Sequence, residues 1–240
     1  GFGHTRPLPS VLMKKQEIEQ HAPVATEAAL IKLWIDSMDL KGIRLLGLGT
    51  SNSICLRLNQ MSDAIDFVVF SNPLFNPAIW DVIRPTWLQR MIRQTVLSKS
   101  GLKIAVRGLR AVLRRDPLWF YRQFAQKSAG DVAYIKANEA DFLTAGMFLQ
   151  KLEPDVYFYE LRSALMDDNR WNPAHCESID AVILSGTDTT ENWIGTIVEE
   201  ADRLGLPIVF ANAGDLFVPY ASPDSLLEIL KNHSANVAAL

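Results

Sequence analysis

Residues 46 to 58 read Leu46-Gly47-Leu48-Gly49-Thr50-Ser51-Asn52-Ser53-Ile54-Cys55-Leu56-Arg57-Leu58. We interpret Arg44 to Leu48 as a strand and the residues after Gly49 as the start of a helix, so the second glycine stands at the tight bend between them. Because glycine has no side chain, the chain presents bare backbone at this bend.

This stretch resembles the nucleophile elbow of the α/β-hydrolase family, whose pattern G-x-S-x-G lies between a strand and a helix. Alignment without gaps places Gly47 at the first glycine and Gly49 where the nucleophilic serine belongs. The resemblance therefore implies a member of the family whose nucleophile is missing.

A second register keeps a nucleophile, because Ser51 stands only two residues further on. The family helix needs a small residue about six positions after the elbow residue, where it packs against the sheet. The Gly49 register places Cys55 there, and the Ser51 register places Arg57 there. A buried arginine without a partner is costly, so the first register is preferred and Ser51 stays as the alternative.

The resemblance extends over most of the chain and implies an α/β fold, a mostly parallel sheet with flanking helices. Residues 1–73 and 175–240 are expected to form the hydrolase-like core, and residues 74–174 a helical cap insertion. The segments that resemble family elements are the loop Gly1 to Pro7, the helix Ala25 to Ser37, the strands Ile65 to Phe70, Ala181 to Leu184 and Pro207 to Ala211, and the helix Pro223 to Leu230.

The same comparison implies that the first strands of the fold are absent from this chain. The elbow strand, normally central, would then expose unpaired N–H and C=O groups along one side. We expect such an edge to be covered, either by an N-terminal segment outside this chain or by a second copy in a homodimer.

The other two triad positions are also filled by unusual residues. The resemblance places Thr189 at the position of the triad acid, with Asp188 one residue short of it, and Asp215 at the position of the triad histidine. A serine nucleophile needs an imidazole to take its proton, and an aspartate, with a normal pKa of about 4, is a poor substitute.

None of the four histidines is expected to replace the missing base. His175 precedes a predicted strand and His233 falls in the last helix, so both should lie away from the elbow, whereas His4 and His21 stand in the N-terminal segment. His4 comes nearest in family terms. A loop histidine is more often a solvated or capping residue than a catalytic base.

Composition is that of an ordinary globular protein of 240 residues, with 48% hydrophobic residues and a net charge of −3. No run approaches the roughly 18 to 20 apolar residues of a membrane span, and no signal peptide is visible. The two cysteines, Cys55 and Cys176, do not form a disulfide framework, which favours a reducing, cytoplasmic location. No spacing predicts a metal site, and no cofactor is expected.

The first half of the predicted cap is basic. Residues 84 to 122 contain ten Lys or Arg residues and one acid, Asp116, so this stretch carries +9 and the rest of the chain −12. A solvated helix face between Lys103 and Arg115 explains this most simply; an anionic ligand, an acidic partner or anionic lipid are alternatives. No motif for direct binding of nucleic acid is present.

These observations lead to two functional hypotheses. The first is a catalytically silent domain that binds a small hydrophobic or anionic ligand or acts as a regulatory or interaction module, for example within a transcriptional regulator. Its candidate ligand contacts are Thr50, Trp80, Trp87, Trp193 and Phe217. The alternative is an active serine hydrolase for esters or amides, with Ser51 as nucleophile and Asp188 or Asp215 in altered roles.

Overall fold

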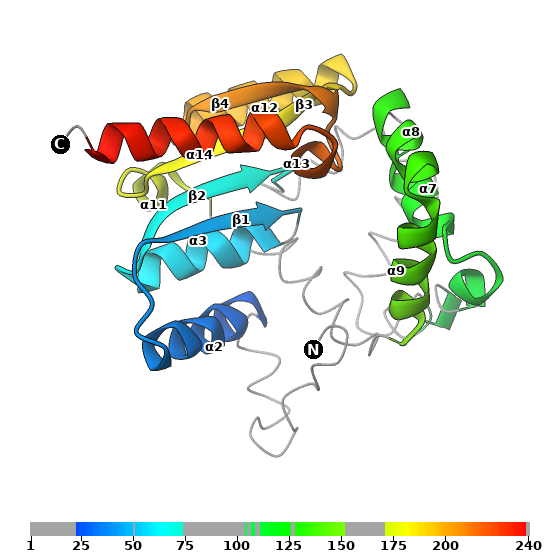
Figure 1. Ribbon diagram of the computed structural model, residues 1–240, viewed down its shortest axis with the longest axis horizontal. Helices are drawn as coiled ribbons and strands as arrows, with labels where there is room; N and C mark the ends of the chain where they lie inside the picture. Colours follow the sequence, from blue (N-terminus) through cyan, green and yellow to red (C-terminus); the bar gives the residue numbers. More distant parts are fainter. Residues whose placement is uncertain are drawn as a thin grey trace.

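The structure is a computed structural model that describes residues 23–49, 51–73, 104, 107–108, 111–125, 128–151 and 171–238. Its helices and strands alternate along most of the chain (Figure 1). In chain order they are α2 (Pro23–Ser37), β1 (Ile43–Leu48), α3 (Ser51–Met61), β2 (Ile65–Ser71), α7 (Trp119–Ala125), α8 (Ala129–Ala137), α9 (Glu139–Lys151), α11 (Pro173–Cys176), β3 (Ala181–Asp188), α12 (Glu191–Leu204), β4 (Ile208–Gly214), α13 (Val218–Ala221) and α14 (Pro223–Ala238).

The four described strands form one parallel sheet in the order β1-β2-β3-β4. The two central strands are apolar on both faces, as strands of a covered parallel sheet must be. In β2, Phe67 and Val69 contribute to one hydrophobic core, whereas Val68 and Phe70 contribute to the other. The period of two along an extended chain accounts for this division.

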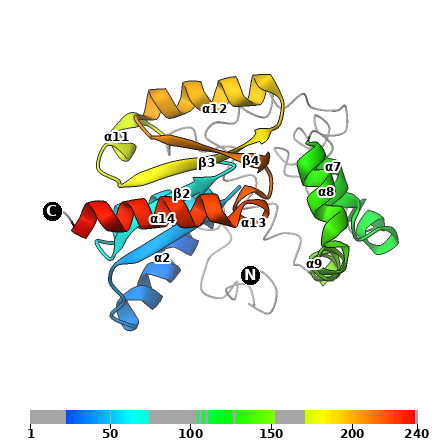
Figure 2. The same cartoon turned by 45° about the horizontal axis from the view of Figure 1, so that its top comes forward.

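Helices cover both faces of the sheet (Figures 1 and 2). On one face, α2, α3 and α12 bury residues such as Ala28, Leu56 and Ile197 against the strands. On the other face, α13 and α14 bury Val218 and Ile229. The predicted α/β class with a parallel sheet and flanking helices is confirmed, and the predicted strands correspond to β1 to β4.

The helices α7, α8 and α9 belong to the segment predicted as a cap, and they stand beyond the carboxyl ends of the strands (Figure 1). Ser128 begins α8 as its N-cap, and its side-chain oxygen accepts a hydrogen bond from the N–H of Asp131 at 2.9 Å. This bond satisfies one of the free N–H groups at the start of the helix. The division into core and cap stays a prediction, because much of residues 74–174 lies outside the described residues.

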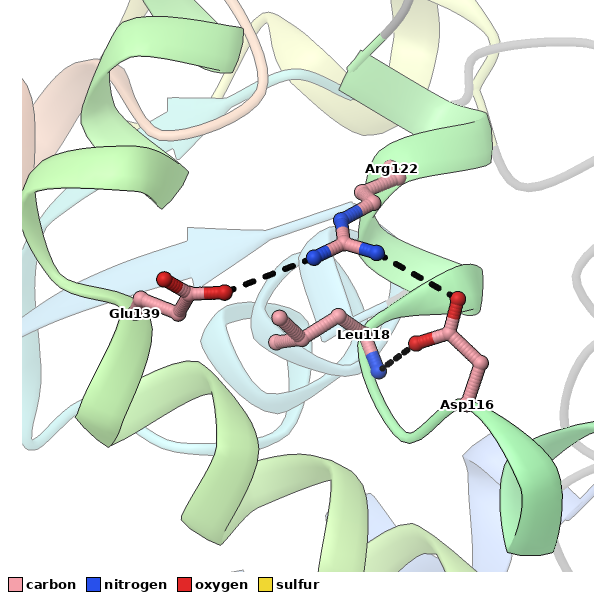
Figure 3. Close-up of polar contacts among 4 residues, drawn as sticks. All are labelled: Asp116, Leu118, Arg122 and Glu139. Atoms are coloured by element: carbon pink, nitrogen blue, oxygen red, sulfur yellow. Dashed lines mark hydrogen bonds and ion pairs between the residues drawn. The ribbon is translucent and has the colours of Figure 1, made fainter.

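An ion-pair cluster joins two of these helices (Figure 3). Arg122 on α7 contacts Asp116 at 3.3 Å and Glu139 on α9 at 3.4 Å, and Asp116 also accepts a hydrogen bond from the N–H of Leu118. This basic residue is therefore paired with acids. Arg107, Arg114 and Arg115, from the same basic stretch, are exposed, as a solvated helix face requires.

Candidate functional site

Gly49 forms the bend between β1 and α3. Its φ angle is +55°, in the left-handed region where residues with a side chain are uncommon, and its N–H donates to the carbonyl of Ser71 at 3.1 Å. A Cβ atom added to Gly49 would meet no atom of the described residues within 4 Å. With respect to those residues, the space in front of the bend is open, and Gly49 itself offers only backbone there.

Asn52, on the first turn of α3, fixes the shape of this bend. Its side-chain nitrogen donates to the carbonyl oxygens of Gly49 and Ser71, both at 2.8 Å. A Cβ on Gly47 would lie 2.5 Å from the Asn52 side-chain oxygen and 2.9 Å from its Cα. Gly47 is thus required by the close approach of α3 to the end of β1.

Ser51 lies at the start of α3, with its hydroxyl turned to the backbone of β1. Its Oγ accepts a hydrogen bond from the N–H of Leu48 at 2.8 Å and donates to the Leu48 carbonyl at 2.9 Å. Further along the same helix, Cys55 packs against the hydrophobic core and Arg57 is exposed. This is the packing that the Gly49 register requires.

Asp215 follows the end of β4 and is buried. Its carboxylate accepts hydrogen bonds from the hydroxyl of Ser185 at 2.7 Å, the N–H of Gly186 at 2.9 Å and the indole of Trp193 at 2.7 Å. Burial raises the pKa of Asp215, and these three donors oppose the shift. Both oxygens are therefore bound to β3 and α12, not directed to the elbow at the end of β1.

Asp188, at the end of β3, binds the start of the cap helix α8. Its Oδ2 accepts hydrogen bonds from the backbone N–H of Gly130 and from the Ser128 hydroxyl, the latter at 3.2 Å. A carboxylate at a helix N-terminus is favoured by the helix dipole. Thr189, the residue at the triad-acid position, is half-buried in the turn after β3.

Asp131 on α8 makes a hydrogen-bonded contact in the opposite direction, from the cap helix to the segment after β4. Sequence reasoning did not predict a role for this residue. From the first turn of α8 it accepts hydrogen bonds from the backbone N–H groups of Leu216 at 3.1 Å and Phe217 at 3.3 Å. Burial raises the pKa of Asp131 to about 6; these N–H groups lower it, and the charge of Asp215 adds to the increase. The spacing Ser128-x-x-Asp131 before a helix was the available signal.

Two glycines allow this junction to close. A Cβ on Gly130 would lie 2.8 Å from a carboxylate oxygen of Asp188 and 2.9 Å from the N–H nitrogen of Gly214, and a Cβ on Gly214 would lie 2.6 Å from the backbone nitrogen of Asp131. The start of α8 therefore meets the ends of β3 and β4 backbone to backbone. We call this set of contacts, made by Ser128, Gly130, Asp131, Asp188 and Gly214, the cap latch.

The structure places the described candidate ligand contacts in different surroundings. Trp193 lies in the hydrophobic core with 4% of its surface exposed and bonds Asp215. Phe217 packs against the cap, with its ring centroid 5.6 Å from that of Tyr134 and 5.0 Å from that of Phe142. Thr50, Trp80 and Trp87 lie outside the described residues.

The described histidine side chain, His233 on α14, is far from the elbow in the fold. Its Nε2 lies 2.9 Å from a carboxylate oxygen of Asp180, which precedes β3 at the amino end of the strands. His175 belongs to α11, which also precedes β3, whereas His4 and His21 lie outside the described residues. Within the described part of the chain, the structure therefore brings no imidazole to Gly49 or Ser51.

Within those same ranges, no group of three or more His, Cys, Asp or Glu residues is placed to hold a metal ion. The helices that the structure describes include none with the length and apolar character of a membrane span.

No family model matches this sequence, and no curated protein matches it. Solved structures do resemble it. A bromoperoxidase from Bacillus anthracis has a TM-score of 0.55 and 15% identity, over 88% of this chain and 74% of its own. A hydrolase from Oleispira antarctica has a TM-score of 0.57 and 12% identity, over 89% and 72%.

An enol-lactonase from Burkholderia xenovorans LB400 matches at a TM-score of 0.55 and 12% identity, over 88% of this chain and 73% of its own. At such identities the likeness concerns the fold alone. The chain spans about three quarters of the length of these structures. Together with the parallel sheet, its flanking helices and the bend at Gly49, these matches show that the chain has an α/β-hydrolase-like fold.

Proposed function

We propose that this chain is a catalytically silent α/β-hydrolase-like domain that acts in binding or regulation. The observation that carries the proposal is Gly49, which has a φ of +55° at the bend between β1 and α3. A hydrolase of this fold needs a nucleophilic side chain at this bend, and glycine supplies none.

The surroundings of the bend support the same conclusion. The Ser51 hydroxyl is held by both backbone groups of Leu48, so its proton is already donated to a carbonyl. The Asp215 carboxylate, at the position of the triad base, is saturated by donors from β3 and α12. Members of a catalytic triad act as a unit, so the loss of several members removes nearly all of their contribution.

The open space in front of Gly49 supports a binding role. Among the described residues, no atom lies within 4 Å of a Cβ placed there, which supports access of a small molecule to the backbone at the bend and to the N-terminus of α3. The ligand class we propose is small and hydrophobic or anionic. A regulatory module within a larger regulator is the second form of this role, by analogy of fold.

We also propose that the protein works in a reducing, cytoplasmic environment. Cys55 and Cys176 are both free, and burial raises the pKa of each thiol to about 11. Both are therefore protonated at neutral pH and unreactive as nucleophiles.

The alternative is an active ester or amide hydrolase, and the Oleispira antarctica protein of similar fold is a hydrolase. For Ser51 to act as its nucleophile, the hydroxyl has to leave both Leu48 groups and find a base. The deciding experiment treats the purified chain with a fluorophosphonate probe and a panel of p-nitrophenyl esters, beside the Ser51→Ala and Ser37→Ala variants. We expect no labelling and no turnover; labelling that Ser51→Ala abolishes and Ser37→Ala retains establishes the hydrolase instead.

Binding at the bend is tested separately. Aliphatic and aromatic carboxylates and lactones are screened by thermal shift against the wild type and Gly49→Leu, whose side chain fills the open space. We expect a stabilising compound that loses its effect in the variant. Equal stabilisation of both proteins places the ligand elsewhere and contradicts this part of the proposal.

A further inference from the structure

The cap latch brings two buried carboxyl groups close together. Asp131, on the first turn of α8, has 3% of its surface exposed, and Asp215, just after β4, has 5%. Gly214, the residue before Asp215, has no room for a Cβ because the side chain of Asp131 occupies that space. Burial and a neighbouring like charge both disfavour the ionised form of a carboxyl, so this arrangement opposes two negative charges.

The described surroundings of the pair supply no compensating cation. In the part of the chain that the structure describes, no Lys, Arg or His forms an ion pair with Asp131 or Asp215. Arg122 is paired with Asp116 and Glu139, and Lys136 is exposed. The charged or titratable groups on the elements around Asp131 are Tyr121 and Arg122 on α7, Tyr134 and Lys136 on α8, Glu139 and Asp141 on α9, Asp188 at the end of β3, Asp215 after β4 and Tyr220 on α13.

The hydrogen-bond donors decide which of the two carboxyls takes up a proton. Asp215 accepts from three donors at 2.7, 2.9 and 2.7 Å, and two of these are N–H groups that can only donate. Asp131 accepts from two N–H groups at 3.1 and 3.3 Å. More and shorter bonds from donors favour the ionised form. Asp215 therefore keeps its charge, and Asp131 is the group that gains and loses a proton.

Asp131 also stands where α8 is attached to the sheet. Of the described hydrogen bonds between the start of α8 and the ends of β3 and β4, Asp188 accepts two and Asp131 accepts the other two, from Leu216 and Phe217. A change in the charge of Asp131 therefore acts directly on the contact that holds this cap helix in place.

We propose that the cap latch is a pH-dependent switch. It holds α8 against the ends of β3 and β4 while Asp131 carries a proton, and it opens more often when Asp131 ionises beside Asp215. The opening separates α8 from the segment after β4 and leaves the sheet folded. The inference goes beyond the proposed function, because it requires neither a ligand nor the bend at Gly49.

Raising the pH weakens the closed latch. Burial raises the pKa of Asp131 to about 6 when the latch is closed, whereas water reaches the carboxyl in the open latch and returns its pKa to about 4. Closure is therefore strongest below pH 4 and weakens as pH rises through 6. For these two values, linkage increases the opening constant about tenfold between pH 5 and pH 7.5.

Hydrogen exchange at the amides of Leu216 and Phe217, which donate to Asp131, measures this opening. Exchange rates at pH 5 and pH 7.5 are compared with those of an unstructured chain at the same pH, so that the pH dependence of the exchange chemistry cancels. We expect the protection factors of both amides to fall about tenfold at the higher pH.

Ile183 serves as the internal reference, because its N–H donates to Pro207 between β3 and β4 at 2.8 Å. We expect the latch amides to be much less protected than this amide at both pH values. Protection that does not change with pH contradicts the proposal. Protection as high as that of Ile183 also contradicts it, since the latch then opens only when the sheet unfolds.

Two variants assign the effect to one carboxyl. Asp131→Asn keeps the size of the side chain and removes its charge, so the protection of Leu216 and Phe217 should lose its pH dependence. Asp141→Asn removes an exposed carboxylate from the cap helix α9 and is the matched control, which should retain the tenfold change. A tenfold fall in Asp131→Asn shows that another group operates the latch and overturns the proposal.

The wild type alone provides a further test if Asp131→Asn does not fold, as circular dichroism will reveal. Carboxyl carbon resonances of protein labelled with ¹³C-aspartate are followed by NMR from pH 4 to pH 8. We expect Asp131 to titrate with a midpoint near 6 and Asp215 to remain ionised between pH 5 and pH 7.5. A midpoint near 4 for Asp131, or titration of Asp215 in this range instead, overturns the proposal.

Discussion

The carboxyl edge of the sheet has two contrasting halves. At the end of β1, the bend at Gly49 is open as far as the structure describes the chain, and an added Cβ would meet no described atom within 4 Å. At the ends of β3 and β4, the cap latch is closed, with backbone packed on backbone and with the buried Asp131 and the half-buried Asp188 in reciprocal hydrogen bonds. Asp188 and Asp215, at or next to the positions that the family resemblance gives to the triad acid and base, make structural hydrogen bonds on the closed side, and glycine stands at the bend on the open side.

The contrast predicts that the same glycine-to-alanine substitution destabilises the closed side much more than the open side. Gly214→Ala places a methyl group against Asp131 and should separate α8 from β4. We expect this to lower the free energy of unfolding by about 4 kcal/mol, because overpacking and lost hydrogen bonds add together. Urea denaturation measures the change. A loss below about 1 kcal/mol shows that the latch is looser than the structure indicates.

A second prediction concerns the hydrogen bonds that Asp188 accepts in the cap latch. Asp188→Ala leaves the N–H of Gly130 and the hydroxyl of Ser128 without their acceptor at a partly buried junction. We expect a loss of about 3 kcal/mol, since each unsatisfied buried group costs about 1 to 3 kcal/mol. Asp202→Ala, an exposed aspartate on α12, is the control and should change stability by less than about 0.5 kcal/mol.

A third prediction concerns pH. Because the pKa of Asp131 is raised to about 6 in the folded state, above its value of about 4 in an unfolded chain, the folded state binds the extra proton between these two values. The contribution of Asp131 to stability is therefore greatest below pH 4 and falls as pH rises through 6.

Unfolding free energies of the wild type and Asp131→Asn test this at pH 4 and pH 7. We expect the difference between the two proteins to change by about 2 kcal/mol, with the wild type relatively more stable at pH 4. Asp215 is present in both proteins, so its own titration largely cancels. A difference that does not vary with pH contradicts the assignment of the raised pKa to Asp131.

The smallest effect is expected on the open side. The methyl group of Gly49→Ala meets no atom of the described residues, so we expect its cost to be the backbone strain of a non-glycine residue at φ +55°, about 1 kcal/mol. The melting temperature should fall by a few degrees. If Gly49→Ala lowers the free energy of unfolding as much as Gly214→Ala does, the space at the bend is filled.

Gly49→Ser sharpens the same comparison, because it restores a hydroxyl without restoring a base. We expect no ester hydrolysis above background from this variant, since no described imidazole stands near the bend. Turnover by Gly49→Ser reveals a base that the described residues do not include.

Much of the fold could be predicted from the sequence. The apolar runs of β2, β3 and β4 and the glycines before α3 are local signals, because strand burial and tight bends depend on a few neighbouring residues. The same holds for the assignment of Gly49 to the bend. The positions of Asp188 and Asp215 after their strands were also visible, but not the groups they bind.

Those groups could not be predicted because they come from distant parts of the chain. Asp188 binds Gly130, 58 residues away, and Asp131 binds Leu216, 85 residues away. Trp193 was predicted as a candidate ligand contact from residue type alone, which gave no sign that its indole donates to Asp215 within the core. Apolar and polar side chains alike are placed by which helix docks on which strand, and no local pattern records that.

By itself, then, the amino-acid sequence determined the alternation of strands and helices and the bare bend after β1, since both follow from residue types a few positions apart. Only the tertiary structure decided that the start of α8 closes over β3 and β4 and that Asp131 and Asp188 hold it there. These features depend on packing between elements, whose energy is set by contacts across the fold and not by the order of residues along the chain.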